Sequence, residues 1–182
     1  ENFNHNKKNL ILNNITNIKL YNFGFYSSQK VLYENSVNPT NSGMINYLEE
    51  DKVTNQLKAL KFVDGDSFIK SEELFEKNIG VIKIDVEGAE YHVLLGLREY
   101  LKKSNSTLHI EIDNKNLLKY NSSLNKILIL LKECGYTLFS NVGEDPNHYD
   151  MICKKVILKY DSGKLGIDDV STTDEFVDEW LW

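Results

Sequence analysis

Apolar positions recur along the chain with two spacings, and the segments they mark alternate between strands and helices. A spacing of two favours strands over residues 18–22, 30–33, 56–63, 81–85 and 107–112. A spacing of three or four favours helices over residues 1–14, 66–75, 86–101 and 124–133. Two more strands, 136–140 and 149–157, are expected to pair antiparallel across a loop at 141–148. Together these elements predict an α/β fold.

Turn and cap residues fix the ends of several of these elements. Ser122 or Ser123 is expected to cap the 124–133 helix, and Gly135 to end it. Asp66 or Ser67 is expected to cap the shorter helix over residues 66–75. The segment 38–43 is rich in turn residues and predicts a loop.

The stretch from Val81 to Glu90 is the one around which the chain is organised. It predicts a short buried strand ending at Asp85, a turn holding Glu87 and Gly88, and then a helix. Open α/β sheets bind ligands at the carboxyl ends of their strands. An anion beside a helix N-terminus also gains about 0.3–1 kcal/mol from the helix dipole. The two acids are therefore either site residues or helix caps.

Glu111 occupies the equivalent place near the end of the next strand. If the two strands are neighbours, Asp85 and Glu111 lie side by side. Two close carboxylates push their pKa values apart, so one could accept a proton while the other orients. His109, in the middle of the 107–112 strand, fits a packed imidazole better than a catalytic one. His148, at the entrance of the last strand, is either a strand residue or a substrate contact.

Composition narrows the classes of partner. With 182 residues the chain has the length of one domain, and its net charge of −6 argues against nucleic acid as the main partner. No apolar run approaches the ~20 residues of a membrane span, and no signal peptide is seen. We therefore expect a cytoplasmic protein that does not enter a membrane. Cys134 and Cys153 lack metal-ligand spacing, which favours reduced, buried thiols, and no residue cluster predicts a metal site.

The charge is concentrated at the C-terminal end. From residue 158 onward there are seven acids and two lysines, which is −5 of the total of −6. We therefore divide the chain into a domain over residues 1–157 and an acidic tail over residues 158–182. A short helix starting at Ser171 or Thr173 would present Phe176, Trp180 and Leu181 on one edge, and we expect it to dock on the domain or on a partner.

The central stretch resembles a known family. Lys83 to Glu90, read as Lys-Ile-Asp-Val-Glu-Gly-Ala-Glu, with Leu94 and Gly96 behind it, is similar to the central motif of the FkbM-type S-adenosylmethionine-dependent methyltransferases. Four other segments resemble the family in the same order along the chain: residues 9–14, 17–28, 41–43 and 108–112. The similarity covers roughly residues 1–157.

The resemblance implies a fold, a cofactor and a set of site residues. The implied fold is the Rossmann-like class I methyltransferase sheet, mostly parallel with an antiparallel C-terminal hairpin. The implied activity is methyl transfer from S-adenosylmethionine to a hydroxyl of a sugar, glycan or secondary metabolite. Gly24 and Phe25 would lie against the adenine, although an ordinary strand exit with a core phenylalanine explains them equally well. Glu87 and the Gly88 backbone would lie near the methionine end of the cofactor or the substrate. Asp85 would also bind the cofactor, and Asp85 with Glu111 would be catalytic. The implied substrate contacts lie in the loop with Asn41 and Gly43, and the place of His148 at the entrance of the last strand makes it a further candidate.

Part of the family's pattern is not found in the sequence. The glycine-rich turn after a first strand, and the second strand with its ribose-binding acid, have no counterpart, so we expect the chain to be part of a longer polypeptide. Two alternatives to a methyltransferase remain. One is a non-catalytic interaction or binding module that retains the sheet. The other is a sugar-nucleotide transferase domain, although no phosphate-cradling loop supports it.

Overall fold

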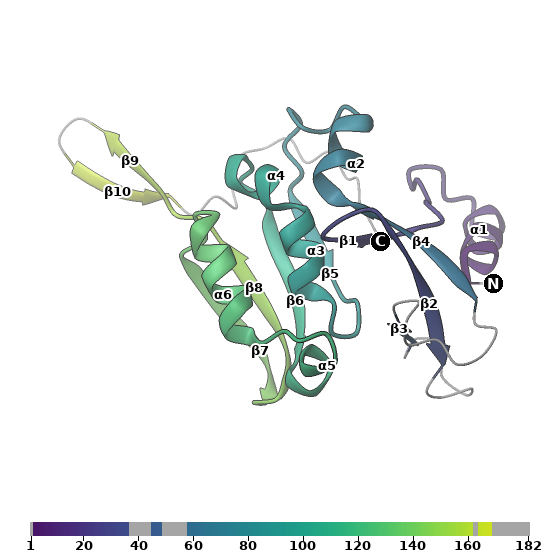
Figure 1. Cartoon of the computed structure of the whole chain (residues 1–182). Coiled ribbons are helices and arrows are strands. Elements are labelled where there is room, and N and C mark those ends of the chain that lie inside the picture. The colour runs from purple at the N-terminus through teal and green to yellow at the C-terminus, as the bar shows by residue number, and fades with distance from the viewer. Residues whose placement is uncertain (1, 37–44, 49–57, 162–163, 169–182) are drawn as a thin grey trace.

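The structure, a computed structural model, describes residues 2–36, 45–48, 58–161 and 164–168, which form an α/β fold with mixed sheets (Figure 1). One sheet contains β1 (Gly24–Tyr26), β2 (Lys30–Ser36), β3 (Ile45–Leu48) and β4 (Ala59–Asp64). A second contains β5 (Val81–Ile84), β6 (Thr107–Asp113), β7 (Leu138–Asp145) and β8 (His148–Lys154). The helices are α1 (Asn2–Leu12), α2 (Gly65–Ser71), α3 (Glu90–Gly96), α4 (Arg98–Lys103), α5 (Asn114–Lys119) and α6 (Leu124–Glu133).

Each four-stranded sheet combines one parallel pair with antiparallel neighbours. The first has the order β1-β4-β2-β3, with β1 parallel to β4, and the second has the order β5-β6-β8-β7, with β5 parallel to β6. The antiparallel pair at the end of the second sheet, β7 with β8, confirms the expected C-terminal hairpin. The described strands do not, however, form the single, mostly parallel sheet that the family resemblance implies.

The second sheet has one face that is covered by helices. Leu108, Ile110 and Ile112 of β6 are fully buried and belong to the same core cluster as residues of α3, α4, α5 and α6. In Figure 1 these helices lie together on one side of β5, β6, β7 and β8. The alternate residues of β6 are half-buried and point to the other side. The strand periodicity read from the sequence is therefore confirmed, with its apolar half facing the helices.

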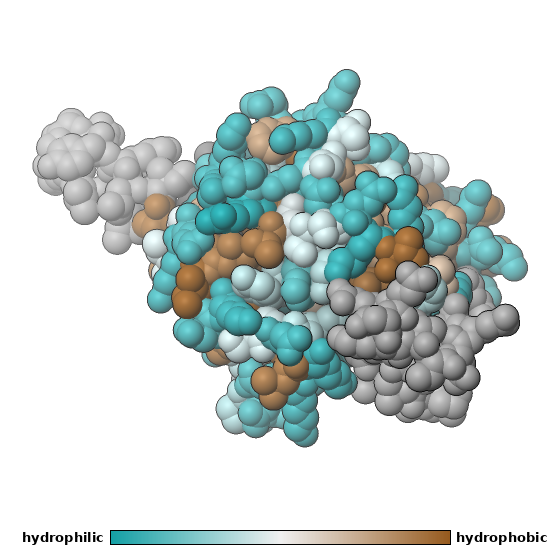
Figure 2. Space-filling model, viewed as in Figure 1, coloured by the Kyte–Doolittle hydropathy of each residue, from teal (hydrophilic) through white to brown (hydrophobic). Residues whose placement is uncertain are grey.

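Helix α6 follows the sequence prediction closely. It spans Leu124–Glu133, the Ser123 side chain accepts a hydrogen bond from the Lys126 backbone N–H (3.4 Å), and Gly135 adopts φ +93 just beyond the end. Its outer face carries Ile129, which is half exposed. Figure 2 shows this side of the molecule as mainly hydrophilic, with separate apolar patches.

The expected helix over residues 86–101 is wrong in its limits. Residues 85–89 form a turn, α3 begins at Glu90, and the helix is interrupted at Leu97 before α4. Glu87 (φ +55) and Gly88 (φ +109) have left-handed backbone conformations, which cannot continue an α-helix. The apolar periodicity was nevertheless real, because both helices bury the same side of the chain in the core.

Other element limits also differ from the sequence prediction. No strand forms over residues 18–22; the strand begins at Gly24, because Tyr21 and Phe23 pack their rings against Phe68 instead of alternating beside a neighbouring strand. Asp64, not Asp66 or Ser67, caps α2 by accepting from the Ser67 N–H (2.8 Å). The predicted loop 141–148 is mostly strand, since β7 continues to Asp145 and β8 begins at His148. Strand β3 and helix α5 were not predicted.

Beyond the second sheet, β9 (Ile157–Asp161) and β10 (Lys164–Asp168) form an antiparallel hairpin that extends away from the end of β8 (Figure 1). The predicted substrate loop with Asn41 and Gly43, and the predicted tail helix, lie outside the described residues. Among the helices of the described part of the chain, none combines the length and apolar character needed to cross a bilayer.

Candidate functional site

The turn between β5 and α3 is held in place by a buried acid. The carboxylate of Glu90, which is 1% exposed, accepts hydrogen bonds at Oε1 from the backbone N–H groups of Gly88 (3.0 Å) and Val86 (3.3 Å). Its other oxygen, Oε2, is buried and has no hydrogen-bond partner in the described part of the chain. Burial raises the pKa of Glu90 even though hydrogen bonds from backbone N–H groups act in the opposite direction. Glu90 therefore fixes the turn that carries Asp85 and Glu87.

The same turn is fastened to α5 on its other side. A Cβ added to Gly88 would lie 2.3 Å from the backbone oxygen of Asn116, so only glycine fits at this contact. The Asn116 side chain donates from Nδ2 to Glu87 Oε2 (2.9 Å). Burial, followed by the nearby charges of Glu111, Asp85 and Asp113, raises the pKa of Glu87. Glu87 is thus engaged with α5 and is not among the residues that line the cavity described next.

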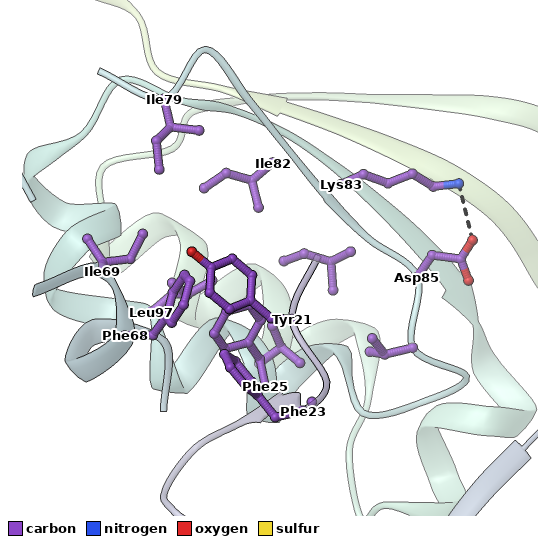
Figure 3. A pocket seen from close by; sticks show the side chains of 14 residues that line it. Tyr21, Phe23, Phe25, Phe68, Ile69, Ile79, Ile82, Lys83, Asp85 and Leu97 are labelled. Carbon is purple, nitrogen blue, oxygen red and sulfur yellow. Dashed lines mark ion pairs between the residues drawn. The ribbon is translucent and has the colours of Figure 1, made fainter. Parts of the chain in front are cut away.

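A cavity of about 330 Å³ opens beside β5, between that strand and the segment leading into β1 (Figure 3). Four aromatic rings form one wall, the aliphatic side chains of β5, α2 and α3 form the floor, and a charged pair lies at the rim. Its lining residues are Tyr21, Phe23, Gly24, Phe25, Phe68, Ile69, Ile79, Ile82, Lys83, Ile84, Asp85, Val86, Val93 and Leu97. A volume of this size lies in the range of small-molecule sites, which are about 300–1,000 Å³.

The aromatic wall is a single packed cluster. Phe25 and Phe68 have ring centroids 5.2 Å apart, and Phe23 lies 5.5 Å from Phe68, in edge-to-face arrangements. Tyr21 joins the cluster through Phe68 at 4.9 Å, and its hydroxyl donates to Glu72 Oε2 (2.6 Å). The wall is therefore anchored through Tyr21, and it offers flat apolar surface to a ligand in the cavity.

The charged rim of the cavity is formed by Lys83 and Asp85. The pair lies at the right of the cavity in Figure 3, with Lys83 Nζ 3.1 Å from Asp85 Oδ2. The Asp85 side chain is 42% exposed. An anionic group at the mouth of an apolar cavity suits a ligand with a flat ring at one end and a cation at the other. The structure thus brings the predicted cofactor residues Gly24, Phe25 and Asp85 to one cavity.

Packing against Phe62 explains why residue 24 is a glycine. A Cβ at this position would lie 2.3 Å from an atom of the Phe62 ring, so the glycine makes room for Phe62 of β4. The sequence argument that Gly24 admits a ligand base is therefore not needed to explain this glycine, although the residue does line the cavity.

Glu111 is hydrogen-bonded to His148 and not to Asp85. His148 Nε2 donates to Glu111 Oε1 (2.9 Å), with 55% of the His148 side chain and 22% of the Glu111 side chain exposed. This hydrogen bond raises the pKa of His148, and the charges of Asp113 and Asp145 act in the same direction. The predicted catalytic residue Glu111 and the predicted substrate residue His148 therefore form one unit.

Sequence reasoning missed two residues that shape the site, Glu90 and Asn116. A signal for Glu90 was present, because this acid stands among the buried, apolar positions of a predicted helix. Asn116 gave no signal, since it belongs to a helix that was not predicted. In the described residues, no group of three or more His, Cys, Asp or Glu side chains is arranged to hold a metal ion.

Comparison with known proteins gives one match. The family model described as "Methyltransferase FkbM domain" matches residues 1–138, which include β5, the turn and α3. No curated protein and no solved structure matches the chain.

Proposed function

The chain belongs to the FkbM methyltransferase family, and from this premise we propose that it transfers a methyl group from S-adenosylmethionine to a hydroxyl of a sugar, glycan or secondary metabolite. The observation that carries the proposal is the match over residues 1–138 together with the cavity at the end of β5, where Gly24, Phe25 and Asp85 meet. A cytoplasmic location is part of the proposal.

The residues around the cavity fit parts of the proposed cofactor. The rings of Phe23 and Phe25 suit the adenine, because a flat base packs favourably on aromatic side chains. The carboxylate of Asp85, at the rim, suits the cationic half of the molecule. When bound, the cofactor supplies an activated methyl group on a sulfonium. The chain has to orient the acceptor, exclude water and remove a proton.

Binding of the cofactor is the direct test. Isothermal titration of S-adenosylmethionine and S-adenosylhomocysteine into the longest natural chain should give saturable binding. Thermal unfolding provides a second readout, because a ligand at 100 times its Kd stabilises the folded state by about 2.7 kcal/mol, or roughly 5–11 °C in Tm for a protein of this size. A folded chain that binds neither ligand would refute the proposal and favour the interaction module.

Two variants locate the binding site. Asp85→Asn should weaken S-adenosylmethionine binding by about tenfold or more, because a charged contact is worth about 1.5–3 kcal/mol. Asp150→Asn is its matched control, since the Asp150 side chain on β8 is equally exposed, at 43% against 42%, and does not line the cavity. Equal affinities for the two variants would move the cofactor away from β5. Tight binding of a nucleotide diphosphate sugar in place of S-adenosylmethionine would favour the transferase alternative.

A further inference from the structure

Strands β6 and β8 place two histidine–carboxylate pairs on the sheet face opposite the helices. In the register of the two strands, Glu111 lies opposite Asp150, and Asp113 lies opposite His148. The contacts run diagonally: His148 Nε2 to Glu111 Oε1 is 2.9 Å, and His109 Nε2 to Asp150 Oδ1 is 3.0 Å. The two pairs have similar chemistry but lie at different positions along the strands. The His109–Asp150 pair therefore serves as a control for the His148–Glu111 pair.

The two pairs also differ in geometry. His148 is the first residue of β8 and forms a hydrogen bond with Glu111, whereas His109 stands in the middle of β6 and its Nε2 makes no hydrogen bond with Asp150 despite the short distance. A carboxylate that accepts a hydrogen bond from Nε2–H fixes the imidazole tautomer and leaves the lone pair on Nδ1. The hydrogen bond of the His148 ring to Glu111 uses Nε2, and 55% of the side chain is exposed.

His148 stands at the same end of the sheet as Asp85, the acid at the rim of the cavity. Asp85 follows the last residue of β5, which pairs in parallel with β6, and His148 lies on the far side of β6. Two strand spacings of about 4.8 Å separate β5 from β8 by about 10 Å. Side chains reaching inward from both strands can therefore contact one acceptor from two sides.

From this arrangement we infer that His148, held by Glu111, takes the proton from the acceptor hydroxyl, an inference that rests on the proposed methyl transfer. In that step the hydroxyl oxygen forms a bond to the methyl carbon, and the bond between that carbon and sulfur breaks with its electron pair going to sulfur. The hydroxyl proton goes to Nδ1 of His148. The products are a methyl ether, a neutral thioether and an imidazolium whose charge is balanced by Glu111.

The other acids at this edge already have different partners. Asp85 is paired with Lys83 at the cavity rim, Glu87 accepts from Asn116, and Asp113 caps α5 by accepting from two backbone N–H groups. A general base works best when its pKa is close to the operating pH, a condition that imidazole meets better than a carboxylate. Glu111 is therefore the positioning residue, and His148 is the base.

The kinetic test compares His148→Asn with His109→Asn in the full chain. The acceptors are methyl glycosides of glucose, mannose and galactose, and the donor is S-adenosylmethionine labelled in its methyl group. His148→Asn should lower kcat by about 10²–10⁴-fold with little change in KM. It should also remove the rise of rate with pH that we expect for the wild type as the histidine loses its proton. His109→Asn should stay within about threefold of the wild type. A His148→Asn variant that keeps more than a tenth of the activity, or the same pH profile, overturns the inference.

A second readout does not need turnover. The ring signals of His148, followed by NMR in the free protein, should titrate above the ordinary histidine range, and Glu111→Gln should return the midpoint toward that range. A midpoint that Glu111→Gln leaves unchanged shows that the pair does not hold the ring, which overturns the inference.

Calorimetry with S-adenosylmethionine separates this inference from the proposed function. His148→Asn should bind the cofactor as tightly as the wild type does. A wild-type protein that does not bind S-adenosylmethionine refutes the methyltransferase proposal. Normal binding without transfer to any glycoside counts against the hydroxyl chemistry, and therefore against His148 as its base.

Discussion

Gly96 is the position at which the packing of the fold and the shape of the candidate site can be tested together. It ends α3, and a Cβ built there would lie 2.1 Å from the backbone oxygen of Tyr26 and 3.3 Å from the backbone nitrogen of Gly65. Both neighbours are main-chain atoms, which cannot rotate away as a side chain does. Gly96→Ala therefore forces α3 away from β1, the strand that carries Gly24 and Phe25 of the cavity.

The size of the effect follows from two opposing contributions. Overpacking a tight contact costs about 1–3 kcal/mol, and a clash with rigid backbone belongs at the upper end. Alanine in a helix is favoured over glycine by about 1 kcal/mol, which offsets part of that cost. We expect a net loss of about 2 kcal/mol in the free energy of unfolding. For a protein of this size the loss corresponds to a fall of about 4–8 °C in Tm.

Gly135→Ala is the matched control for Gly96→Ala. Gly135 adopts φ +93, but the nearest atom to an added Cβ is 3.6 Å away on the flexible Lys155 side chain. Its cost is therefore backbone strain alone, about 1–2 kcal/mol. Urea unfolding should show comparable losses for the two variants, whereas S-adenosylmethionine affinity should fall only in Gly96→Ala. If Gly96→Ala is as stable as the wild type or more stable, helix propensity outweighs packing and the close approach of α3 to β1 is refuted.

Three further predictions concern ionisable groups. Glu90→Ala should lower the free energy of unfolding in urea by about 2 kcal/mol, because the Gly88 N–H would lose its partner. Glu90→Gln keeps an acceptor oxygen and should cost clearly less. Equal costs for the two variants would contradict the role of Glu90 in holding the turn. Cys134 and Cys153 should resist thiol reagents at pH 8 until the protein unfolds. Burial raises the pKa of both thiols, that of Cys153 to about 12. Rapid labelling of the folded protein would contradict this prediction. Pairing raises the pKa of His148, so its stabilisation is complete below about pH 6.5 and is lost as the pH rises through the raised value. The stability difference between wild type and His148→Asn should therefore shrink between pH 6 and pH 9, by no more than about 1 kcal/mol for so exposed a pair.

The parts of the fold that the sequence predicts well are those in which one element has one buried face. In β6 the buried residues Leu108, Ile110 and Ile112 alternate with polar ones, and in α6 the apolar stripe, the cap at Ser123 and the glycine at Gly135 agree with one another. Local pattern and tertiary environment give the same answer in these elements, so the pattern alone is sufficient.

The parts that the sequence does not predict depend on contacts between distant segments. The interruption after Gly96 reflects the approach of α3 to the Tyr26 backbone, and the late start of β1 reflects the packing of Tyr21 and Phe23 on Phe68. An apolar residue has the same hydrophobicity whether it alternates in a strand or fills a cluster. Periodicity therefore located the apolar residues but not the limits of the elements that carry them.

For the candidate site, the sequence predicted that the strands carrying Asp85 and Glu111 are neighbours, but not the partners of these acids. Asp85 and Glu111 were expected to act as a pair because they end neighbouring parallel strands, and β5 and β6 are indeed parallel neighbours. The contact between Glu111 and His148 depends on the register of β6 with β8, which a predicted loop at 141–148 concealed. A shift of one residue in that register would turn His148 to the opposite face of the sheet.

The different partners of Asp85 and Glu111 suit these two carboxylates to different roles. Asp85 pairs with Lys83 and lines the cavity, where its carboxylate can attract a cationic group. Glu111 faces a histidine, where a carboxylate holds a ring in one tautomer and stabilises the charge it acquires. Methyl transfer from a sulfonium to a hydroxyl needs both functions at once, because a positive charge disappears at the donor while a proton leaves the acceptor. In the proposed reaction Asp85 would hold the cationic donor, and Glu111 would balance the charge that His148 acquires, so the two carboxylates would have separate roles.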